Sequence, residues 1–88
     1  MSEVRVVAEA GAYQVTVSDA SGETRHRVTV SPADLARLGA GRTAEELVAA
    51  AFRFLLAREP KEAILARFDL SVIGRYFPEF ERELPKLL

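Results

Sequence analysis

Apolar and polar residues alternate along the first third of the chain, a pattern typical of β-strands with one buried and one exposed face. Segments 12–18 and 24–30 both alternate in this way, and the turn-forming residues at 19–22 separate them. This arrangement predicts an antiparallel hairpin. Segment 3–9 alternates as well, so residues 1–31 are expected to form either this hairpin or a three-stranded meander.

A helix start follows the predicted strands. Ser31 can cap the free backbone N–H groups of a first turn, and Pro32 suits the first helical position because its missing N–H would be unsatisfied there. Gly39 and Gly41 follow closely and lower the helix propensity. The sequence therefore predicts a short helix that begins at residue 32.

The strongest helix signal lies in the middle of the chain. Thr43 and Glu46 have the spacing of a capping box, and Pro60 ends the helical pattern near Glu59. Segment 47–57 is apolar around most of its circumference, so protein must cover it on more than one side. The strands can cover one side, and either the C-terminal third or a second subunit must cover the other.

The last third is predicted to be helical but interrupted. Three of its apolar residues share one helical stripe, namely Ile64, Leu65 and Phe68. Asp69 can cap a short helix after them, and the position before Pro78 is biased away from helical geometry. We therefore expect one α+β domain spanning 1–88, in which 1–31 form the β-meander and 32–88 are helical around one central apolar helix.

The same apolar helix favours association with other protein. Leaving its second side in water would forfeit several kcal/mol of burial, so a homo-oligomer is expected, and an unidentified protein partner is an alternative. Large aromatic side chains suit such an interface, although they suit a core equally well. The predicted interface residues are Phe52, Leu56, Tyr76, Phe77 and Phe80.

Composition and charge exclude several further classes of protein. The 88 residues are 49% hydrophobic and 28% charged, which excludes a wholly disordered chain. The net charge of −1 argues against a general polyanion binder, and the lack of cysteine excludes disulfides and zinc–thiolate sites. The first residues resemble no leader peptide, and no apolar run approaches about 20 residues. We therefore expect a cytoplasmic protein without a membrane segment.

Catalytic and metal-binding chemistry find little support. His26 is the single histidine and shares strand parity with Val28 and Val30, so we expect it to be a buried structural residue without an orienting carboxylate. The loop at 39–43 lacks the lysine of a nucleotide-binding loop. One acidic cluster consists of Glu79, Glu81 and Glu83. Its spacing favours solvated ion pairs over a metal site, so we predict no enzyme, no cofactor and no metal.

One polar pattern is compatible with nucleic acid. Arg25, Arg27 and Thr29 alternate on the polar face of a predicted strand, where arginine could contact phosphates or guanine. Arg42 and Thr43 lie at the start of the central helix, where backbone N–H groups and the helix dipole favour a phosphate. The alternative interpretation is a solvated sheet face whose charges prevent aggregation.

The order of these segments along the chain is similar to that of a known protein family. The strand Arg-His-Arg-Val-Thr-Val is followed by Ser-Pro-Ala-Asp-Leu and then by Gly-Arg-Thr-Ala-Glu-Glu-Leu-Val. With these motifs, residues 25–56 resemble the ribbon-helix-helix DNA-binding proteins, whose dimers read the major groove with paired strands. The resemblance implies that the strand at 25–29 reads bases and that the residues at 42 and 43 anchor a phosphate.

Two functions follow from the sequence. The first is a small protein–protein interaction module that forms homo-oligomers and has no catalytic activity. The alternative is a regulator similar to ribbon-helix-helix proteins that binds DNA through the strand at 25–29.

Overall fold

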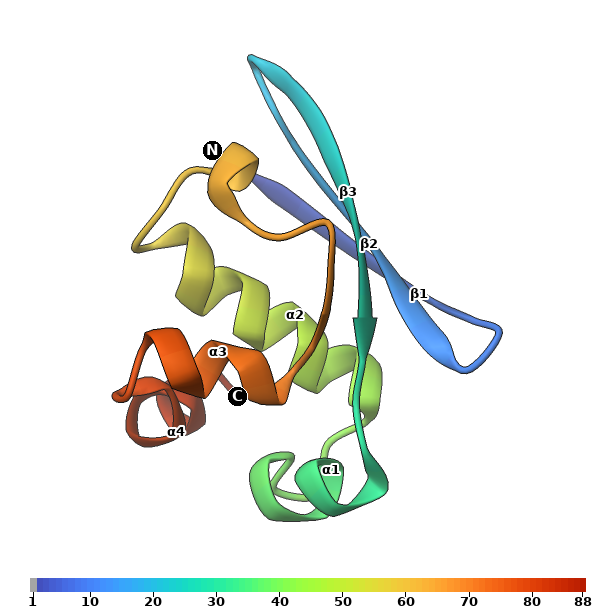
Figure 1. The fold of residues 1–88 in the computed structure, drawn as a ribbon, viewed down its shortest axis with the longest axis vertical. Helices are drawn as coiled ribbons and strands as arrows, with labels where there is room; N and C mark the ends of the chain where they lie inside the picture. The colour runs from blue at the N-terminus through green and yellow to red at the C-terminus, as the bar shows by residue number, and fades with distance from the viewer. Residues whose placement is uncertain (1) are drawn as a thin grey trace.

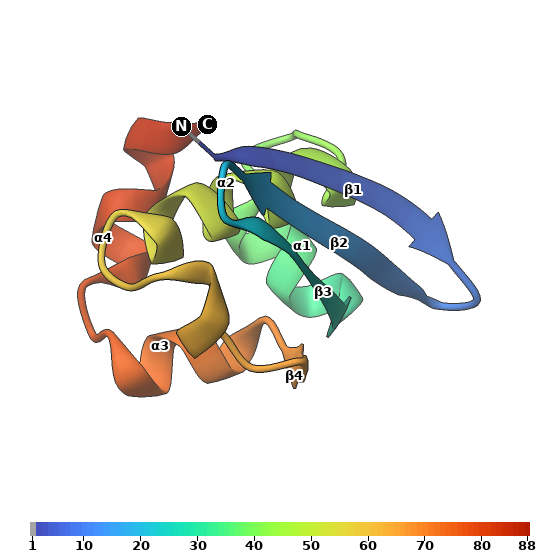
Figure 2. The ribbon, with the colours of Figure 1, turned by 90° about the horizontal axis from the view of Figure 1, so that it is seen from above.

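The computed structural model describes residues 2–88 and consists of a four-stranded sheet with a layer of helices on one of its faces (Figures 1 and 2). The strands are β1 (Glu3–Glu9), β2 (Ala12–Asp19), β3 (Gly22–Thr29) and β4 (Arg67–Asp69). The helices are α1 (Pro32–Leu38), α2 (Ala44–Leu56), α3 (Ser71–Tyr76) and α4 (Phe80–Glu83), with 3-10 turns η1 (Lys61–Ala63) and η2 (Leu84–Leu87). The predicted α+β class is confirmed.

The N-terminal strands form the three-stranded antiparallel meander. Val15 of β2 lies opposite Val6 of β1 and His26 of β3, and all three side chains point toward α2. Val15 and Val28 are fully buried there. We call this side the inner face of the sheet. The alternation in the sequence predicted it because successive side chains of a strand point to opposite faces.

Both predicted helix starts are present. Ser31 Oγ accepts a hydrogen bond from the Asp34 backbone N–H at 3.1 Å. Thr43 and Glu46 form the complete capping box, because Thr43 Oγ1 accepts from the Glu46 N–H at 3.1 Å and the Glu46 carboxylate accepts from the Thr43 N–H at 3.0 Å. Side chains in this way satisfy N–H groups that have no partner within the helix.

The chain itself covers α2 on two sides. Phe52 faces the sheet, with its ring 5.3 Å from that of His26. Phe54 faces the C-terminal third, with its ring 5.7 Å from Phe77 and 5.0 Å from Phe80. The prediction that protein wraps this helix is confirmed. The C-terminal third provides the second cover, so α2 by itself gives no reason to expect a second subunit.

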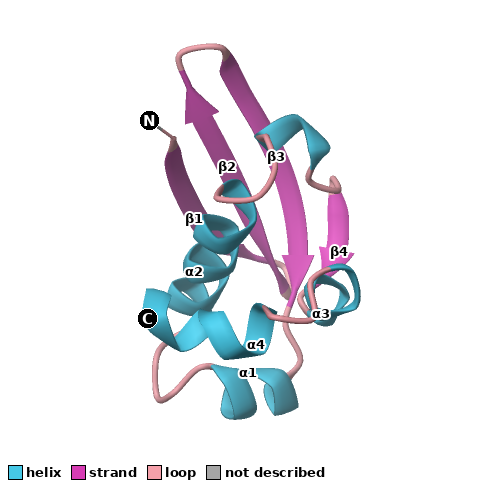
Figure 3. Cartoon of the chain, turned by 90° about the vertical axis from the view of Figure 1, so that its left-hand side faces the viewer, coloured by secondary structure: helices cyan, strands magenta, loops and turns pink. Residues whose placement is uncertain are grey.

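The prediction of helix at 64–68 is wrong. Residues 67–69 form β4, which lies parallel to β3 with Phe68 opposite Val28, and β4 is the edge strand farthest from β1 (Figure 3). The ring of Phe68 lies 6.0 Å from that of Phe52. A helical stripe and a short strand that buries the same apolar side chains are indistinguishable in so few residues, and here the tertiary pairing decides.

No helix within residues 2–88 has the length and apolar character needed to cross a membrane.

Candidate functional site

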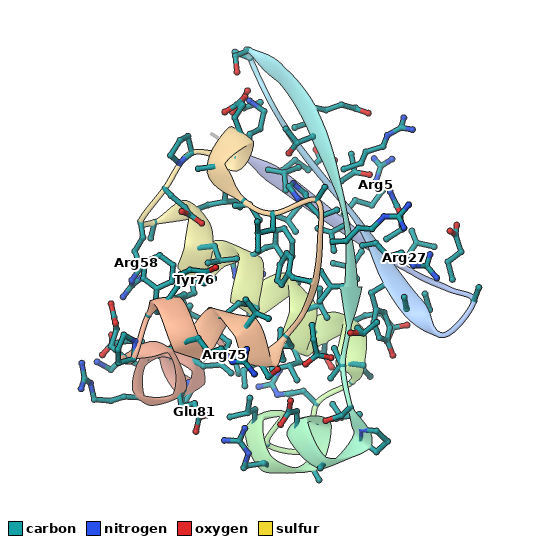
Figure 4. The ribbon with its side chains drawn as sticks, in the orientation of Figure 1. Arg5, Arg27, Arg58, Arg75, Tyr76 and Glu81 are labelled. Carbon is teal, nitrogen blue, oxygen red and sulfur yellow. The ribbon has the colours of Figure 1, made fainter. Side chains whose placement is uncertain are left out.

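An apolar groove opens beside the β4 edge of the sheet, between the end of α2 and α3. It has a volume of about 380 Å³. Its lining residues are Leu55, Glu59, Ala63, Ile64, Leu65, Phe68, Val72, Ile73, Tyr76 and Phe77. Tyr76 is labelled at the surface of α3 in Figure 4. Since this volume falls within the ~300–1,000 Å³ typical of ligand pockets, the groove can receive several apolar side chains or one small molecule.

The groove exposes apolar side chains that a stable fold would otherwise bury. Leu65 is 49% exposed and Tyr76 is 69% exposed. Glu59 is the single charged residue of the lining, so the groove offers little to a charged ligand. Exposed apolar surface within a concave site is typical of a binding site for an apolar or amphipathic partner.

Arg58 fixes the backbone at one end of this groove. Its guanidinium stacks on the Phe54 ring at 3.6 Å, donates to the Phe54 carbonyl at 3.1 Å and pairs with Glu79 at 3.2 Å. The Glu79 backbone N–H and this guanidinium lower the pKa of Glu79. Arg58 therefore ties the end of α2 to the segment before α4 and holds the groove wall in place.

A second surface is the sheet face that no helix covers, which we call the outer face. The register places Arg5 of β1, Thr16 of β2 and Arg25 of β3 in one row across the sheet. The next row contains Val7, Gln14, Arg27 and Arg67. Arg5 and Arg27 project from this face in Figure 4. The two rows together form a band of four arginines around a polar centre.

Carboxylates border this arginine band. Arg5 pairs with Glu3 at 3.3 Å and Arg25 pairs with Glu23 at 3.2 Å, each along its own strand. Exposed pairs of this kind contribute about 0–1 kcal/mol, so both arginines can turn to another anion at little cost. The outer face is therefore mixed in charge, with its arginines in the two rows near the middle of the strands' length.

The structure divides the predicted nucleic-acid contacts between two places. Arg25, Arg27 and Thr29 lie on the outer face, as the alternation predicted. The Thr29 hydroxyl donates to Asp69 at 2.6 Å, and this bond and the one from Ser71 lower the pKa of Asp69. One edge of β3 pairs with β2, and its other edge pairs with β4 at residues 27–29.

Arg42 and Thr43 lie in the helical layer, on the other side of the sheet. Arg42 pairs with Glu46 at 3.5 Å and donates to the Leu88 carbonyl at 3.1 Å. The Thr43 N–H donates to the same Glu46 carboxylate. An acidic side chain thus occupies the place at the start of α2 where a phosphate was predicted, and the hydrogen bonds from Thr43 lower the pKa of Glu46.

His26 is buried and has both ring nitrogens paired. Nδ1 lies 2.8 Å from the Leu65 carbonyl, and Nε2 lies 2.8 Å from Thr24 Oγ1. A carbonyl only accepts, so Nδ1 donates its proton to Leu65, and Nε2 shares a hydrogen bond with the Thr24 hydroxyl. His26 joins β3 to the segment that precedes β4, which is a structural role.

The sequence analysis missed a buried lysine at the tip of the β2–β3 hairpin. Lys61 is 3% exposed and donates to Asp19 at 2.9 Å, to Ser21 at 2.7 Å and to Glu62 at 2.6 Å. Glu62 and Asp19 raise the pKa of Lys61, while hydrogen bonds from Ser21 and Lys61 bring the pKa of Asp19 far below its usual range. This cluster ties the hairpin to η1, and only the contact with Glu62 is local in sequence.

The predicted interface residues fall into two groups. Phe52 and Phe80 are 0% and 2% exposed, so both belong to the core of the chain itself. Leu56 and Phe77 are half-buried, and Phe77 lines the groove. Tyr76 is the one member of the set that exposes most of its surface.

The acidic cluster at 79–83 is dispersed among basic partners. Glu79 pairs with Arg58, Glu81 with Arg37, and Glu83 with Lys86. Within residues 2–88, no three histidine, aspartate or glutamate side chains come together in a way that could hold a metal ion.

Comparisons with family models, with curated protein sequences and with solved structures find no match for this chain.

Proposed function

We propose that this chain is a protein-interaction module that forms homo-oligomers, has no catalytic chemistry of its own and binds an amphipathic helix of another protein in the apolar groove. The exposure of Leu65 and Tyr76 at the groove carries the proposal. Both side chains are partly exposed to water, and a partner's apolar residues would cover them at a gain of about 25 cal/mol per Å².

The shape of the site favours a helix over an extended peptide. β4, the strand beside the groove, has three residues, which gives an added strand few backbone hydrogen bonds. A helix instead binds through apolar side chains spaced along one face. The groove has the volume for such anchors, and Glu59 can pair with a basic residue on the helix.

Selection from a displayed library of random helical peptides tests this proposal. The immobilised wild-type chain should enrich peptides with apolar residues at i, i+3 or i+4 and i+7. The affinity of the best synthetic peptide would then be measured by fluorescence anisotropy. Leu65→Glu should weaken that peptide at least tenfold, because it places a charge against the bound apolar face.

Ala36→Glu is the control, since it adds the same charge at an exposed position of α1 that does not line the groove. This variant should bind the peptide as the wild type does. Enrichment of no peptide, or equal loss of affinity in both variants, would contradict groove binding.

The arginine band favours nucleic acid as a second candidate function. Four guanidinium groups project from two neighbouring rows of one uncovered face, and arginine binds phosphate through paired hydrogen bonds. This candidate keeps Arg25, Arg27 and Thr29 as contact residues but takes β1 and β4 as further contributors. In contrast to the ribbon-helix-helix arrangement, the whole sheet face would lie on the nucleic acid.

A titration of random duplex DNA across a salt series tests this candidate. Binding should strengthen as salt falls, and the double variant Arg25→Ala/Arg27→Ala should lower the slope of log K against log salt by about one per lost phosphate contact. Arg82→Ala, which removes an exposed arginine of α4, is the control. Absence of binding at low salt would eliminate nucleic acid as the ligand.

A further inference from the structure

The outer edge of β1 is an open template for another strand. β1 pairs with β2 from Glu3 to Glu9 without interruption, so it has no bulge, and it contains no proline. Within residues 2–88, no backbone hydrogen bond joins β1 to any element other than β2. Every second N–H and C=O of this strand therefore points away from the sheet. Proteins normally protect an edge of this kind because it pairs readily with another chain.

We propose that β1 pairs antiparallel with β1 of a second copy of this chain, in the register that places Val7 opposite Val7. This inference gives a surface to the self-association proposed above and rests on it. The two sheets would then join into one continuous sheet across a two-fold axis, with the helical layers on the same side. A two-fold interface requires that the strand be complementary to itself.

The charges of β1 select this register. With Val7 at the axis, Arg5 faces Glu9 of the second copy, and the same pair recurs by symmetry. With Val6 at the axis, Glu3 faces Glu9, so like charges repel twice. With Arg5 at the axis, Arg5 faces Arg5. Opposite charges across antiparallel strands stabilise pairing and like charges oppose it. Of these three registers, the one with Val7 at the axis is therefore favoured.

The side chains concerned are free to make these contacts. Arg5 has an exposed pair with Glu3, and Glu9 has a long contact of 3.7 Å with Arg27. Neither interaction is strong enough to hold its side chain in place. Val7 is 51% exposed, and contact with its symmetry mate would remove apolar surface from water on the outer face, where no helix covers it.

Sedimentation equilibrium over a concentration series tests the proposal by charge reversal. The wild type should be a dimer. Arg5→Glu and Glu9→Arg should each weaken the dimer by about tenfold at low salt, because each turns two attractions into two repulsions. An equimolar mixture of the two single variants should dimerise again, since each charge at position 5 of one variant would then face the opposite charge at position 9 of the other. The double variant Arg5→Glu/Glu9→Arg should dimerise as the wild type does.

Arg82→Glu is the control for net charge, and it should leave the dimer unchanged. Circular dichroism of each variant would show that it is folded. A wild type that stays monomeric would overturn both the homo-oligomer and this interface, while peptide binding to the groove would be unaffected. A dimer that is indifferent to both single reversals, or that is not restored in the mixture, would overturn this interface alone.

Discussion

The two faces of the sheet are built from alternate residues of the same strands, yet they differ in almost every physical respect. On the inner face, Val15, Val28 and His26 are buried, and each polar atom of His26 has a partner. On the outer face, Arg25 is exposed and forms a surface ion pair with Glu23. Because successive side chains point to opposite faces, each strand contributes one set of residues to the core and another to an exposed surface. The inner face determines the fold, and the outer face can change without loss of it.

The largest expected effect comes from the helix that covers the inner face. Phe52→Ala should lower the free energy of unfolding by about 3–5 kcal/mol, because Phe52 of α2 is fully buried against the sheet and its truncation leaves a cavity. Chemical denaturation followed by circular dichroism would measure the change. A loss below about 1 kcal/mol, far under the usual cost of such a cavity, would show that the inner layer is not closely packed.

The Asp19–Lys61 cluster is a group of polar contacts outside the apolar core that we nevertheless expect to stabilise the fold. The pKa of Asp19 is lower in the folded chain than its ordinary value near 4. Its charged form therefore stabilises the fold above that value, and this contribution is lost progressively as the pH falls below about 4. Asp19→Asn should reduce the stability at neutral pH and make the decline below about pH 4 less steep.

Thermal melts at a series of pH values would measure this effect. Lys61→Met, which removes the ammonium group that Asp19 binds, should also flatten the acid limb of the profile. An acid limb identical to that of the wild type in both variants would contradict a stabilising role for the cluster.

The smallest effect is expected on the outer face. Arg25→Ala should change the free energy of unfolding by no more than about 0.5 kcal/mol, because surface substitutions away from buried contacts are nearly neutral. The same denaturation experiment would measure it. A loss comparable with that of Phe52→Ala would mean that the outer face belongs to the folded core and is not available for binding.

The meander and the helix starts could be predicted because their signals are local. Alternation at 12–18 and 24–30 defines the hairpin, and the capping box of Thr43 and Glu46 needs residues three apart. β4 could not be found in this way. Three residues are too few to show a period, and their strand geometry comes from pairing with β3, which is distant in sequence.

The candidate sites were predictable only in part, for the same reason. Arg25, Arg27 and Thr29 share one strand, so alternation placed them on one face. The pairing of the strands adds Arg5 and Arg67 to that face, and no local sequence pattern specifies this pairing. The apolar groove draws on α2, the segment before β4, and α3. Several of its residues were assigned to a helical stripe or to an interface, and the hollow between them arises only when these segments pack together.

The late position of β4 in the chain also constrains how the protein folds. The Thr29–Asp69 hydrogen bond spans forty residues, so β4 can join the sheet only after the intervening chain has looped back. Closing so long a loop costs entropy before any contact rewards it, and topologies rich in such contacts fold more slowly than those built from local ones. The meander and α2 are therefore expected to assemble first. The groove, whose wall includes Phe68, would take shape in the final step of folding.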